Sequence, residues 1–399
     1  PLSIQNQQSE IENAVFGALD LCLACKGCKA ECPSGVDMAK LKYEFQHEYY
    51  QSHRRKLRDY LFAYIGPLTQ IGAPFGRFAN WMLSKNVIRK IINPFFGLAL
   101  QRGLPKFGVR ENYPSFWRLL RRQRTAPRKD TMETVLLLCD TFTHFFEPEI
   151  EKAALEVLSA CGINVIFLPY FGAGRTLISK GFIEPARQHA KRILDAIDKL
   201  DPDKKIPVLG IEPSELYTLR EEFLDLLPNR RKEVEELAKR VWLVEEFLVR
   251  PQKNDNNNEL RVTKIVRESP YWDTQKIKLH GHCYQKAQPP AADGFAVGQA
   301  ASAALLLAMG YEVEIIPSGC CGMAGAFGYE AEHYNVSMQV GELTLFPAVR
   351  IATKNGNLVS AVGTSCRSQI LDGADTHAKH PIQMVAERLH KIEASRAFE

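Results

Sequence analysis

A run of four cysteines near the N-terminus constrains this chain most: Cys22, Cys25, Cys28 and Cys32, the last followed by Pro33. The spacing C-x2-C-x2-C-x3-C-P is typical of thiolates that hold a [4Fe–4S] cluster. A zinc site usually draws two C-x2-C pairs from distant segments, whereas here three thiols fall within seven residues. The run therefore predicts an iron–sulfur cluster close to the N-terminus.

The other cysteines support metal binding rather than disulfide bonding. The chain has 399 residues and ten cysteines, and eight of these fall in two tight groups. This usage indicates a reducing compartment, so we expect a cytoplasmic protein. The net charge of +5 is too small to indicate nucleic-acid binding.

Residues 1–130 are expected to be mostly helical, since apolar residues recur at helical spacing before the cysteine run. An apolar stretch follows, from Leu61 to Phe96, which we expect to form short helices broken at Gly and Pro. It carries Lys85, Arg89 and Lys90, so it could lie on the inner face of a membrane. We favour the alternative, that it packs on the next domain or on a partner. A basic linker closes this part of the chain, with Arg118, Arg121, Arg122, Arg124, Arg128 and Lys129.

From about residue 131 the pattern changes to alternating strands and helices, which indicates parallel sheets. Strands are expected at 134–138, 164–169 and 207–211, with a helix at 149–160. After a polar linker at 253–258, the order repeats: strands at 276–280, 312–317 and 358–362, with a helix at 301–309. The sequence thus predicts an α/β protein with an N-terminal all-α part and two tandem repeats, 131–250 and 251–399.

The second cysteine group falls at the strand ends of the second repeat. Cys283 follows the first strand, Cys320 and Cys321 follow the second, and Cys366 follows the third. The carboxyl ends of parallel strands meet at one edge of the sheet, the usual place for a ligand. Four soft thiolates there would suit a second Fe–S cluster or Zn²⁺. Gly319, Gly322, Gly325 and Gly328 would allow close backbone approach.

The first repeat has no cysteines at the equivalent positions. Thr141 stands in place of Cys283, Gly172-Ala173-Gly174 in place of Cys320-Cys321-Gly322, and Glu215 in place of Cys366. We expect this repeat to bind no cluster of its own, and Cys139 and Cys161 to be core residues. Near its strand ends, some polar residues could face the second site: Asp140, His144, Arg175 and Lys180.

These motifs resemble the Fe–S portion of FAD-linked 2-hydroxyacid dehydrogenases, the group of D-lactate, glycolate and D-2-hydroxyglutarate dehydrogenases. The resemblance rests on residues 21–33, Asp140-Thr141-Phe142-Thr143, His280-Gly281-His282-Cys283, residues 318–325 and Gly363-Thr364-Ser365-Cys366-Arg367. It implies a helical ferredoxin-like domain over residues 1–130, followed by two repeats of a cysteine-rich (CCG) domain. Related subunits carry two four-cysteine runs where this chain has one, so Cys32 need not ligate the same cluster as Cys22, Cys25 and Cys28.

The resemblance also implies a function. FAD, in a domain or partner subunit absent from this sequence, would take hydride from the 2-hydroxy acid. This chain would pass the electrons on to a quinone, a cytochrome or another carrier. Two alternatives remain: a thiol reductase like heterodisulfide reductase, acting at Cys283, Cys320, Cys321 and Cys366, and a zinc-stabilised interaction module.

Overall fold

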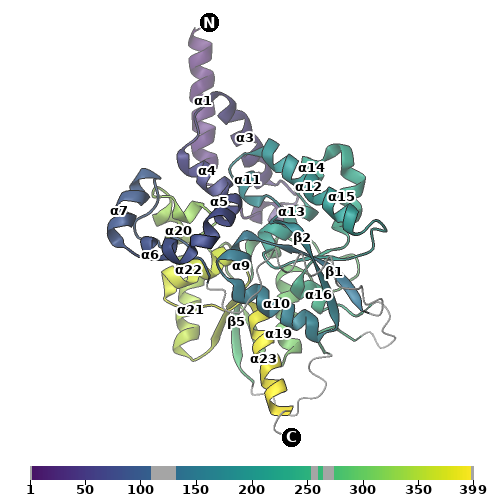
Figure 1. Cartoon of the computed structure of the whole chain (residues 1–399). Coiled ribbons are helices and arrows are strands. Elements are labelled where there is room, and N and C mark those ends of the chain that lie inside the picture. The colour runs from purple at the N-terminus through teal and green to yellow at the C-terminus, as the bar shows by residue number, and fades with distance from the viewer. Residues whose placement is uncertain (1, 109–131, 253–258, 264–273, 397–399) are drawn as a thin grey trace.

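The computed structural model describes residues 2–108, 132–252, 259–263 and 274–396. Helix α1 projects from the body at one end of the molecule, and the C-terminal helix α23 lies at the other (Figure 1). Among the described residues no helix combines the length and apolar character needed to cross a bilayer. The fold is α/β: helices surround two small parallel sheets.

The N-terminal part is helical, as expected. Its elements are α1 (Leu2–Asp20), α2 (Gly27–Glu31), α3 (Met38–Ser52), α4 (Leu57–Ala63), α5 (Ile65–Gly72), a 3₁₀ turn (Ala73–Phe75), α6 (Gly76–Leu83) and α7 (Asn86–Phe95). The helices were expected to end at Gly and Pro residues, but they continue through Gly66-Pro67 and through Pro94. These residues lie inside α5 and α7, and Pro67 is tolerated because it sits in the first turn of its helix.

The first sheet has the strand order β2-β1-β3-β4, with all neighbours parallel. Its strands are β1 (Glu133–Cys139), β2 (Ile163–Phe171), β3 (Val208–Gly210) and β4 (Val241–Leu243). The sequence had not indicated the three-residue β4. The helices of this part are α9 (Thr141–Phe145), α10 (Pro148–Ala160), α11 (Arg175–Ser179), α12 (Ile183–Leu200), α13 (Pro213–Arg220), α14 (Phe223–Leu226), α15 (Arg231–Ala238) and α16 (Val244–Leu248).

The second sheet has the order β6-β5-β7, again all parallel. Its strands are β5 (Lys276–His280), β6 (Glu312–Ile315) and β7 (Leu358–Ala361). The order matches β2-β1-β3, so the first three strands of each sheet share one topology. The helices here are α18 (Cys283–Lys286), α19 (Gly298–Ala308), α20 (Tyr334–Leu343), α21 (Leu345–Lys354), α22 (Thr364–Ala374) and α23 (Pro381–Arg396).

One hydrophobic core joins the two sheets. Along β1, Val135 and Leu137 face a core that also contains Ile277 and Leu279 of β5, while Leu136 faces the opposite side. This alternation follows from the two-residue period of a strand. Helix α10 packs against α23 and α16 packs against α19 within the shared core. The two sheets are therefore held together by apolar burial, which fixes the relative position of their edges.

Several sequence expectations lie outside the described residues, namely the basic linker from Arg118 to Lys129 and the polar linker at 253–258. The boundaries 1–130, 131–250 and 251–399 stay predictions. The apolar stretch was expected to pack on the next domain or on a partner, and the structure tests only the first of these. Phe62 and Ile65 are half-buried, but Phe78 and Trp81 are exposed and so do not pack on the next part of the chain.

Candidate functional site

The first cysteine group lies in a tight loop between α1 and α3. Ala24 and Lys26 both have positive φ, 51° and 60°, which folds the backbone around Cys25. The backbone N–H of Ala24 donates to Sγ of Cys22 at 3.4 Å, and that of Met38 donates to Sγ of Cys28 at 3.4 Å. Donors aimed at sulfur favour the thiolate form and tune a bound Fe–S cluster.

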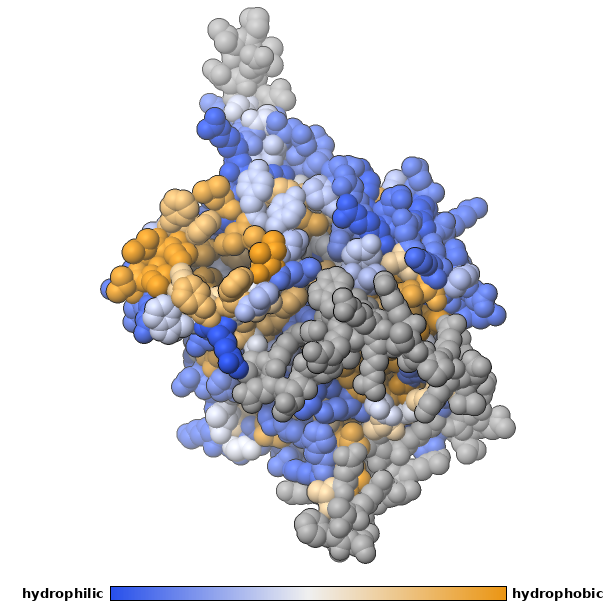
Figure 2. All heavy atoms as spheres, viewed as in Figure 1, coloured by the Kyte–Doolittle hydropathy of each residue, from blue (hydrophilic) through white to orange (hydrophobic). Residues whose placement is uncertain are grey.

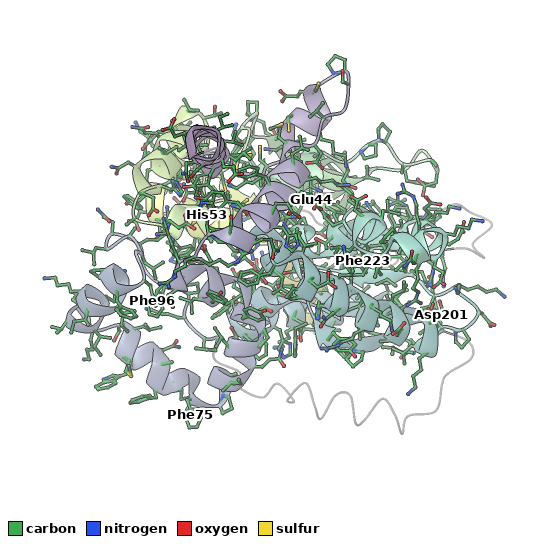
Figure 3. The ribbon with its side chains drawn as sticks, turned by 90° about the horizontal axis from the view of Figure 1, so that it is seen from above. Glu44, His53, Phe75, Phe96, Asp201 and Phe223 are labelled. Carbon is green, nitrogen blue, oxygen red and sulfur yellow. The ribbon has the colours of Figure 1, made fainter. Side chains whose placement is uncertain are left out.

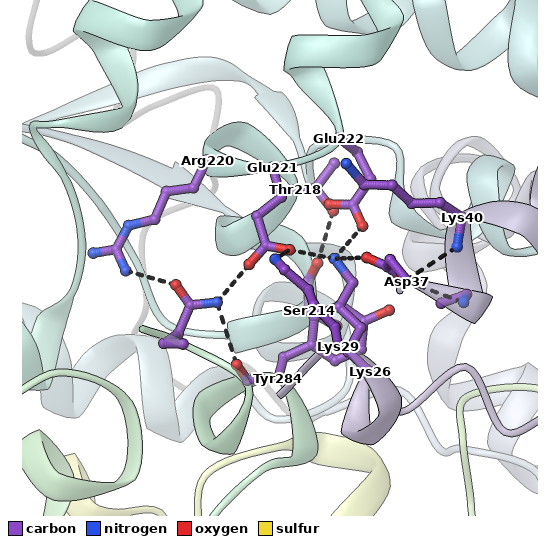
Figure 4. A network of polar contacts seen from close by, with 12 residues as sticks. Lys26, Lys29, Asp37, Lys40, Ser214, Thr218, Arg220, Glu221, Glu222 and Tyr284 are labelled. Carbon is purple, nitrogen blue, oxygen red and sulfur yellow. Dashed lines mark hydrogen bonds and ion pairs between the residues drawn. The ribbon is translucent and has the colours of Figure 1, made fainter. Parts of the chain in front are cut away.

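A buried lysine anchors this loop to the first sheet's helices. Lys26 is 1% exposed, and its Nζ lies 2.6 Å from Glu221 and 2.5 Å from Glu222 (Figure 4). Burial lowers the pKa of Lys26, but Glu222 and Glu221 outweigh it and raise the pKa above its usual value. The same Nζ lies 4.8 Å from the ring centroid of Tyr284, the residue after Cys283. The loop is thus held against the second cysteine group.

Cys25 is close to thiols of both groups. Burial raises its pKa above the usual value, and the neighbouring thiolates of Cys283, Cys22 and Cys28 raise it further. Cys32 differs, because backbone N–H groups at Ser34 and Val36 lower the pKa of its thiol. The structure therefore places Cys25 near Cys22 and Cys28, and gives Cys32 backbone donors of its own.

The second cysteine group converges at the carboxyl edge of the second sheet. Cys283 begins α18, Cys320 and Cys321 lie in the loop after β6, and Cys366 lies in α22. Each thiol shifts the pKa of the next in the order Cys283, Cys320, Cys321, Cys366. The thiol of Cys320 donates to Cys283 and lowers the pKa of Cys283 to about 6. The four residues predicted from the strand ends are therefore neighbours.

The structure adds His280 to this group. A ring nitrogen of His280 and the sulfurs of Cys321 and Cys366 all lie within 4.8 Å of one another, and all three residues are buried. Nδ1 of His280 contacts Oγ of Ser318 at 2.7 Å, while Nε2 is buried without a hydrogen bond among the described residues. Metal–ligand bonds of about 2.0–2.3 Å would bring such a set around one ion. The signal for His280 was its place at the end of β5, three residues before Cys283.

Positive charge and close backbone packing support the second group. Nζ of Lys286 lies 2.9 Å from the carbonyl oxygen of Gly319, in the loop that precedes the two adjacent cysteines. Gly322 has φ 94°, and a Cβ there would lie 2.2 Å from the carbonyl oxygen of Ser337. Gly325 also has positive φ, whereas Gly319 and Gly328 do not. Close approach thus requires glycine at position 322 in particular.

In the first repeat, a carboxylate occupies the equivalent position. Glu215 accepts hydrogen bonds from the backbone N–H groups of Ala173 at 2.6 Å and Arg175 at 3.3 Å. A Cβ at Gly172 would lie 2.8 Å from the same carboxylate. Burial raises the pKa of Glu215 to about 7. The loop that corresponds to Cys320-Cys321-Gly322 is therefore fixed in position by hydrogen bonds to Glu215. In the second repeat a bound metal would fix the equivalent loop.

The remaining polar residues near the first sheet divide into two kinds. Arg175 and Lys180 both line a pocket that also contains Cys283, and Nζ of Lys180 pairs with Glu330 at 2.5 Å. Asp140 instead caps α9 through the N–H groups of Phe142 and Thr143, and His144 contacts Glu151 at 2.7 Å. Cys139 and Cys161 are buried in the shared core, as expected.

One pocket connects the two cysteine groups. Its volume is about 330 Å³, and Cys22, Cys283, Cys320 and Cys321 line one side. The other walls are mostly apolar and come from the N-terminal helices, from the loop after α7 and from α9, with Leu61, Phe62, Ile65, Leu83, Phe107 and Phe142. Polar groups lie among the thiols, including Lys42, whose Nζ donates to the carbonyl oxygen of Cys22 at 2.7 Å. A cavity of this kind suits a small molecule with an apolar body and a polar end.

The residues present fit the metal groups that the sequence implies. N–H donors point at the sulfurs of Cys22 and Cys28, and the unpartnered Nε2 of His280 lies in a thiol-rich environment. Cys321 and Cys366 are buried with their sulfurs close together, which suits a soft metal, while Cys283 and Cys320 are partly exposed. The α/β fold, the two thiol groups and the pocket between them define a protein of redox type.

Comparisons with known proteins agree with that class. The chain is 26% identical over 388 residues to D-2-hydroxyglutarate dehydrogenase of Escherichia coli, a match that covers 95% of this chain and 34% of that protein. The enzyme of the same name from Haemophilus influenzae is 23% identical over 393 residues, covering 95% and 36%. The chain thus spans about a third of the length of these relatives.

Another relative is similar in length to this chain. This relative, one of the subunits of anaerobic glycerol-3-phosphate dehydrogenase from Escherichia coli, is 25% identical over 347 residues. The match covers 85% of this chain and 79% of the relative. No family model matches the chain. All these relatives are named dehydrogenases, so the comparisons class the chain with oxidoreductases.

Proposed function

We propose that this chain is the electron-transfer module of a flavin-dependent dehydrogenase that acts on a 2-hydroxy acid. Relatives that are D-2-hydroxyglutarate dehydrogenases, and another that belongs to a multi-subunit dehydrogenase, support this role. The observation that carries the proposal is that Cys22 of the first group lines the same pocket as Cys283, Cys320 and Cys321 of the second. The flavin would lie in a domain or partner subunit outside this sequence.

The first group would hold a [4Fe–4S] cluster through Cys22, Cys25 and Cys28, with Cys32 or a group from elsewhere as the fourth ligand. Such a cluster supplies single-electron transfer. The residues of this chain hold the loop in place: Lys26 ties it to Glu221 and Glu222, and N–H donors stabilise the thiolates. Burial of Cys25 limits the access of water, which also tunes the potential.

The second group would hold a single soft metal ion, Zn²⁺ in particular, or a second cluster. The close set of His280, Cys321 and Cys366 favours one ion, because its ligand atoms lie within 4.8 Å of one another. Cys283 and Cys320 stand beside it and could complete the coordination. In this proposal zinc would have a structural role at the second site only. Electron transfer would take place at the first site.

The pocket favours a small acceptor over a protein. A cytochrome would need a broad surface near the cluster, whereas the thiols line a cavity of about 330 Å³ with mostly apolar walls. A quinone fits this chemistry, with an apolar body and carbonyl oxygens that Lys42 or Lys180 could reach. Its reduction to quinol consumes two electrons, which arrive through the chain, and two protons from pocket groups and solvent.

The test is the metal content of the chain prepared without oxygen. We expect about one [4Fe–4S] cluster per chain, with iron and inorganic sulfide in equal amounts. Cys25→Ser should remove most of this iron, while Cys161→Ala, a change in the hydrophobic core, should leave it. A colourless protein that contains only zinc would contradict the proposal and support the interaction module.

A further inference from the structure

The segment that forms α5–α7 and the loop after it has an unusual charge pattern. Residues 60–108 contain no Asp or Glu, although the whole chain has 46. The same segment carries six basic residues: Arg77, Lys85, Arg89, Lys90, Arg102 and Lys106. Its charge is therefore of one sign, whereas the surface of an ordinary soluble domain mixes both signs.

The exposed side of these helices is apolar. Seven large apolar side chains there are each more than half exposed: Ile71, Phe75, Phe78, Trp81, Val87, Ile91 and Phe95. We call this set the α5–α7 face. It appears as a continuous orange area over α6 and α7 (Figure 2), and Phe75 lies at the outer edge when the molecule is seen from above (Figure 3).

Three uncharged polar residues of the same helices, Thr69, Asn80 and Asn93, point inward. Asn93 of α7 is fully buried, and its Nδ2 donates to the carbonyl oxygen of Ala99 at 2.9 Å. Asn80 of α6 exchanges two hydrogen bonds of 2.8 Å with the backbone of Phe107. Thr69 of α5 is also buried. A surface helix of a soluble domain normally turns its apolar side to the core and its polar side to water, whereas these helices expose large apolar side chains.

Basic side chains border the α5–α7 face and are available to bind anions. Arg77, Lys85 and Lys90 are exposed, and none has a carboxylate partner among the residues that the structure describes. Nζ of Lys85 lies 5.4 Å from the ring centroid of Trp81, so charge and aromatic surface adjoin. Arg102, in contrast, is buried and paired with Asp372 at 2.7 Å.

We infer that the α5–α7 face docks the chain on an anionic lipid bilayer. Apolar and aromatic side chains on helices that lie in the interface, with lysine and arginine at their border, are the features of such surfaces. A protein partner at this face would need a large apolar surface with acidic groups at its rim. The face offers only apolar groups and cations, which match acyl chains and anionic headgroups.

Docking has a consequence for the pocket. Ile65 of α5, Leu83 of α6 and Phe107 after α7 line it, and the same segment carries the α5–α7 face. The pocket walls would then lie next to the lipid surface, and an acceptor dissolved in the bilayer would be close to the thiols. The docking itself does not depend on the proposed function, because it involves no metal and no electron transfer.

The experiment is flotation of the whole chain with lipid vesicles in a density gradient. With vesicles of phosphatidylcholine and phosphatidylglycerol we expect the chain to float, and with phosphatidylcholine alone to float much less. The double variant Val87→Ser and Ile91→Ser should bind at least about tenfold more weakly. Lys85→Gln and Lys90→Gln should each lose about fivefold in vesicle affinity.

A second measurement is the fluorescence of Trp81. Its emission should shift to the blue on docking, and Trp81→Phe should remove that change.

Matched controls are Leu343→Ser, at an apolar position 80% exposed on α20, and Lys232→Gln, at an exposed lysine of α15. Both should float like the parent chain. Absence of flotation with anionic vesicles, or flotation that the α5–α7 variants leave unchanged, would overturn the inference. The inference would also be overturned if the parent chain bound no vesicles but formed a stoichiometric complex with a protein, and if the α5–α7 variants disrupted that complex.

Discussion

Nζ of Lys26 lies 2.5 Å from Oε1 of Glu222, and the two residues are 196 positions apart in the sequence. This buried pair ties the loop of Cys25 and Cys28 to the segment between α13 and α14. The second carboxylate, Glu221, lies 2.6 Å from the same Nζ and also 2.7 Å from Lys29. The position of the first cysteine group against the second therefore depends on an ionic cluster remote from the cysteine run in sequence.

Removing Lys26 should destabilise the chain strongly. In Lys26→Met, Glu221 and Glu222 would stay buried without their shared cation, at a cost of about 3–5 kcal/mol. The measurement is the free energy of unfolding in urea. Lys40→Met is the matched control, because Lys40 and Asp225 form a pair that is much more exposed, and it should change the free energy by less than about 1 kcal/mol. Equal effects of the two substitutions would contradict this role of Lys26.

His333 should make stability depend on pH above neutrality. Burial lowers its pKa, but hydrogen bonds to Asp20 and Glu330 outweigh it and raise the pKa from 6.5 to about 9. A raised pKa means that the folded state favours the protonated ring, so this stabilisation is complete below pH 6.5. It is lost as the pH rises through about 9. Unfolding measured across this range should show the loss in the parent chain, and His333→Gln should flatten it.

Ser318 should influence the second metal site without binding metal itself. Its Oγ contacts Nδ1 of His280 at 2.7 Å and so fixes the orientation of the imidazole. Loss of such an outer contact typically weakens metal binding by about 10- to 100-fold. Zinc competition with a chelator should show this for Ser318→Ala, and Cys321→Ser should abolish binding. Zinc affinity that is the same in all three proteins would exclude a site at this position.

The pocket prediction can be tested within a single helix. Leu61 of α4 lines the pocket, whereas Leu57 of the same helix is 58% exposed. Leu61→Trp should narrow the cavity and weaken binding of a short-chain quinone analogue by at least about tenfold, and Leu57→Trp should not. Binding is followed by fluorescence quenching, with iron content measured in parallel. If both variants bind the analogue like the parent, the acceptor lies elsewhere.

The isolated chain should oxidise no hydroxy acid. An Fe–S cluster carries single electrons and cannot accept a hydride, which needs a flavin or nicotinamide. Dye reduction with D-2-hydroxyglutarate, D-lactate or glycolate should therefore stay at background until a flavin-containing dehydrogenase domain is added. Turnover by the flavin-free chain would refute the division of labour between the two parts.

The sequence by itself determined the features that are local. The spacing from Cys22 to Cys28 indicated a set of thiolate ligands. Apolar runs indicated β1, β2 and β7, and the alternation of apolar with charged residues indicated β5 and β6. The four cysteines at 283, 320, 321 and 366 could be predicted as neighbours because each follows a strand and the carboxyl ends of parallel strands meet at one edge. The three residues of β4 were too few to give a pattern.

Only the tertiary structure decided how the two thiol groups meet. The loop of the first group is held beside Tyr284, the residue after Cys283, by Lys26 and its carboxylates, which no periodicity connects. His280 joins Cys321 and Cys366 because β5 and β7 are adjacent strands and the loop after β6 reaches the same edge. The outward direction of Phe78 and Trp81 was likewise undecidable from sequence, since an apolar stripe fits a core and a lipid surface equally well. What distinguishes them is which side of each helix the rest of the chain covers.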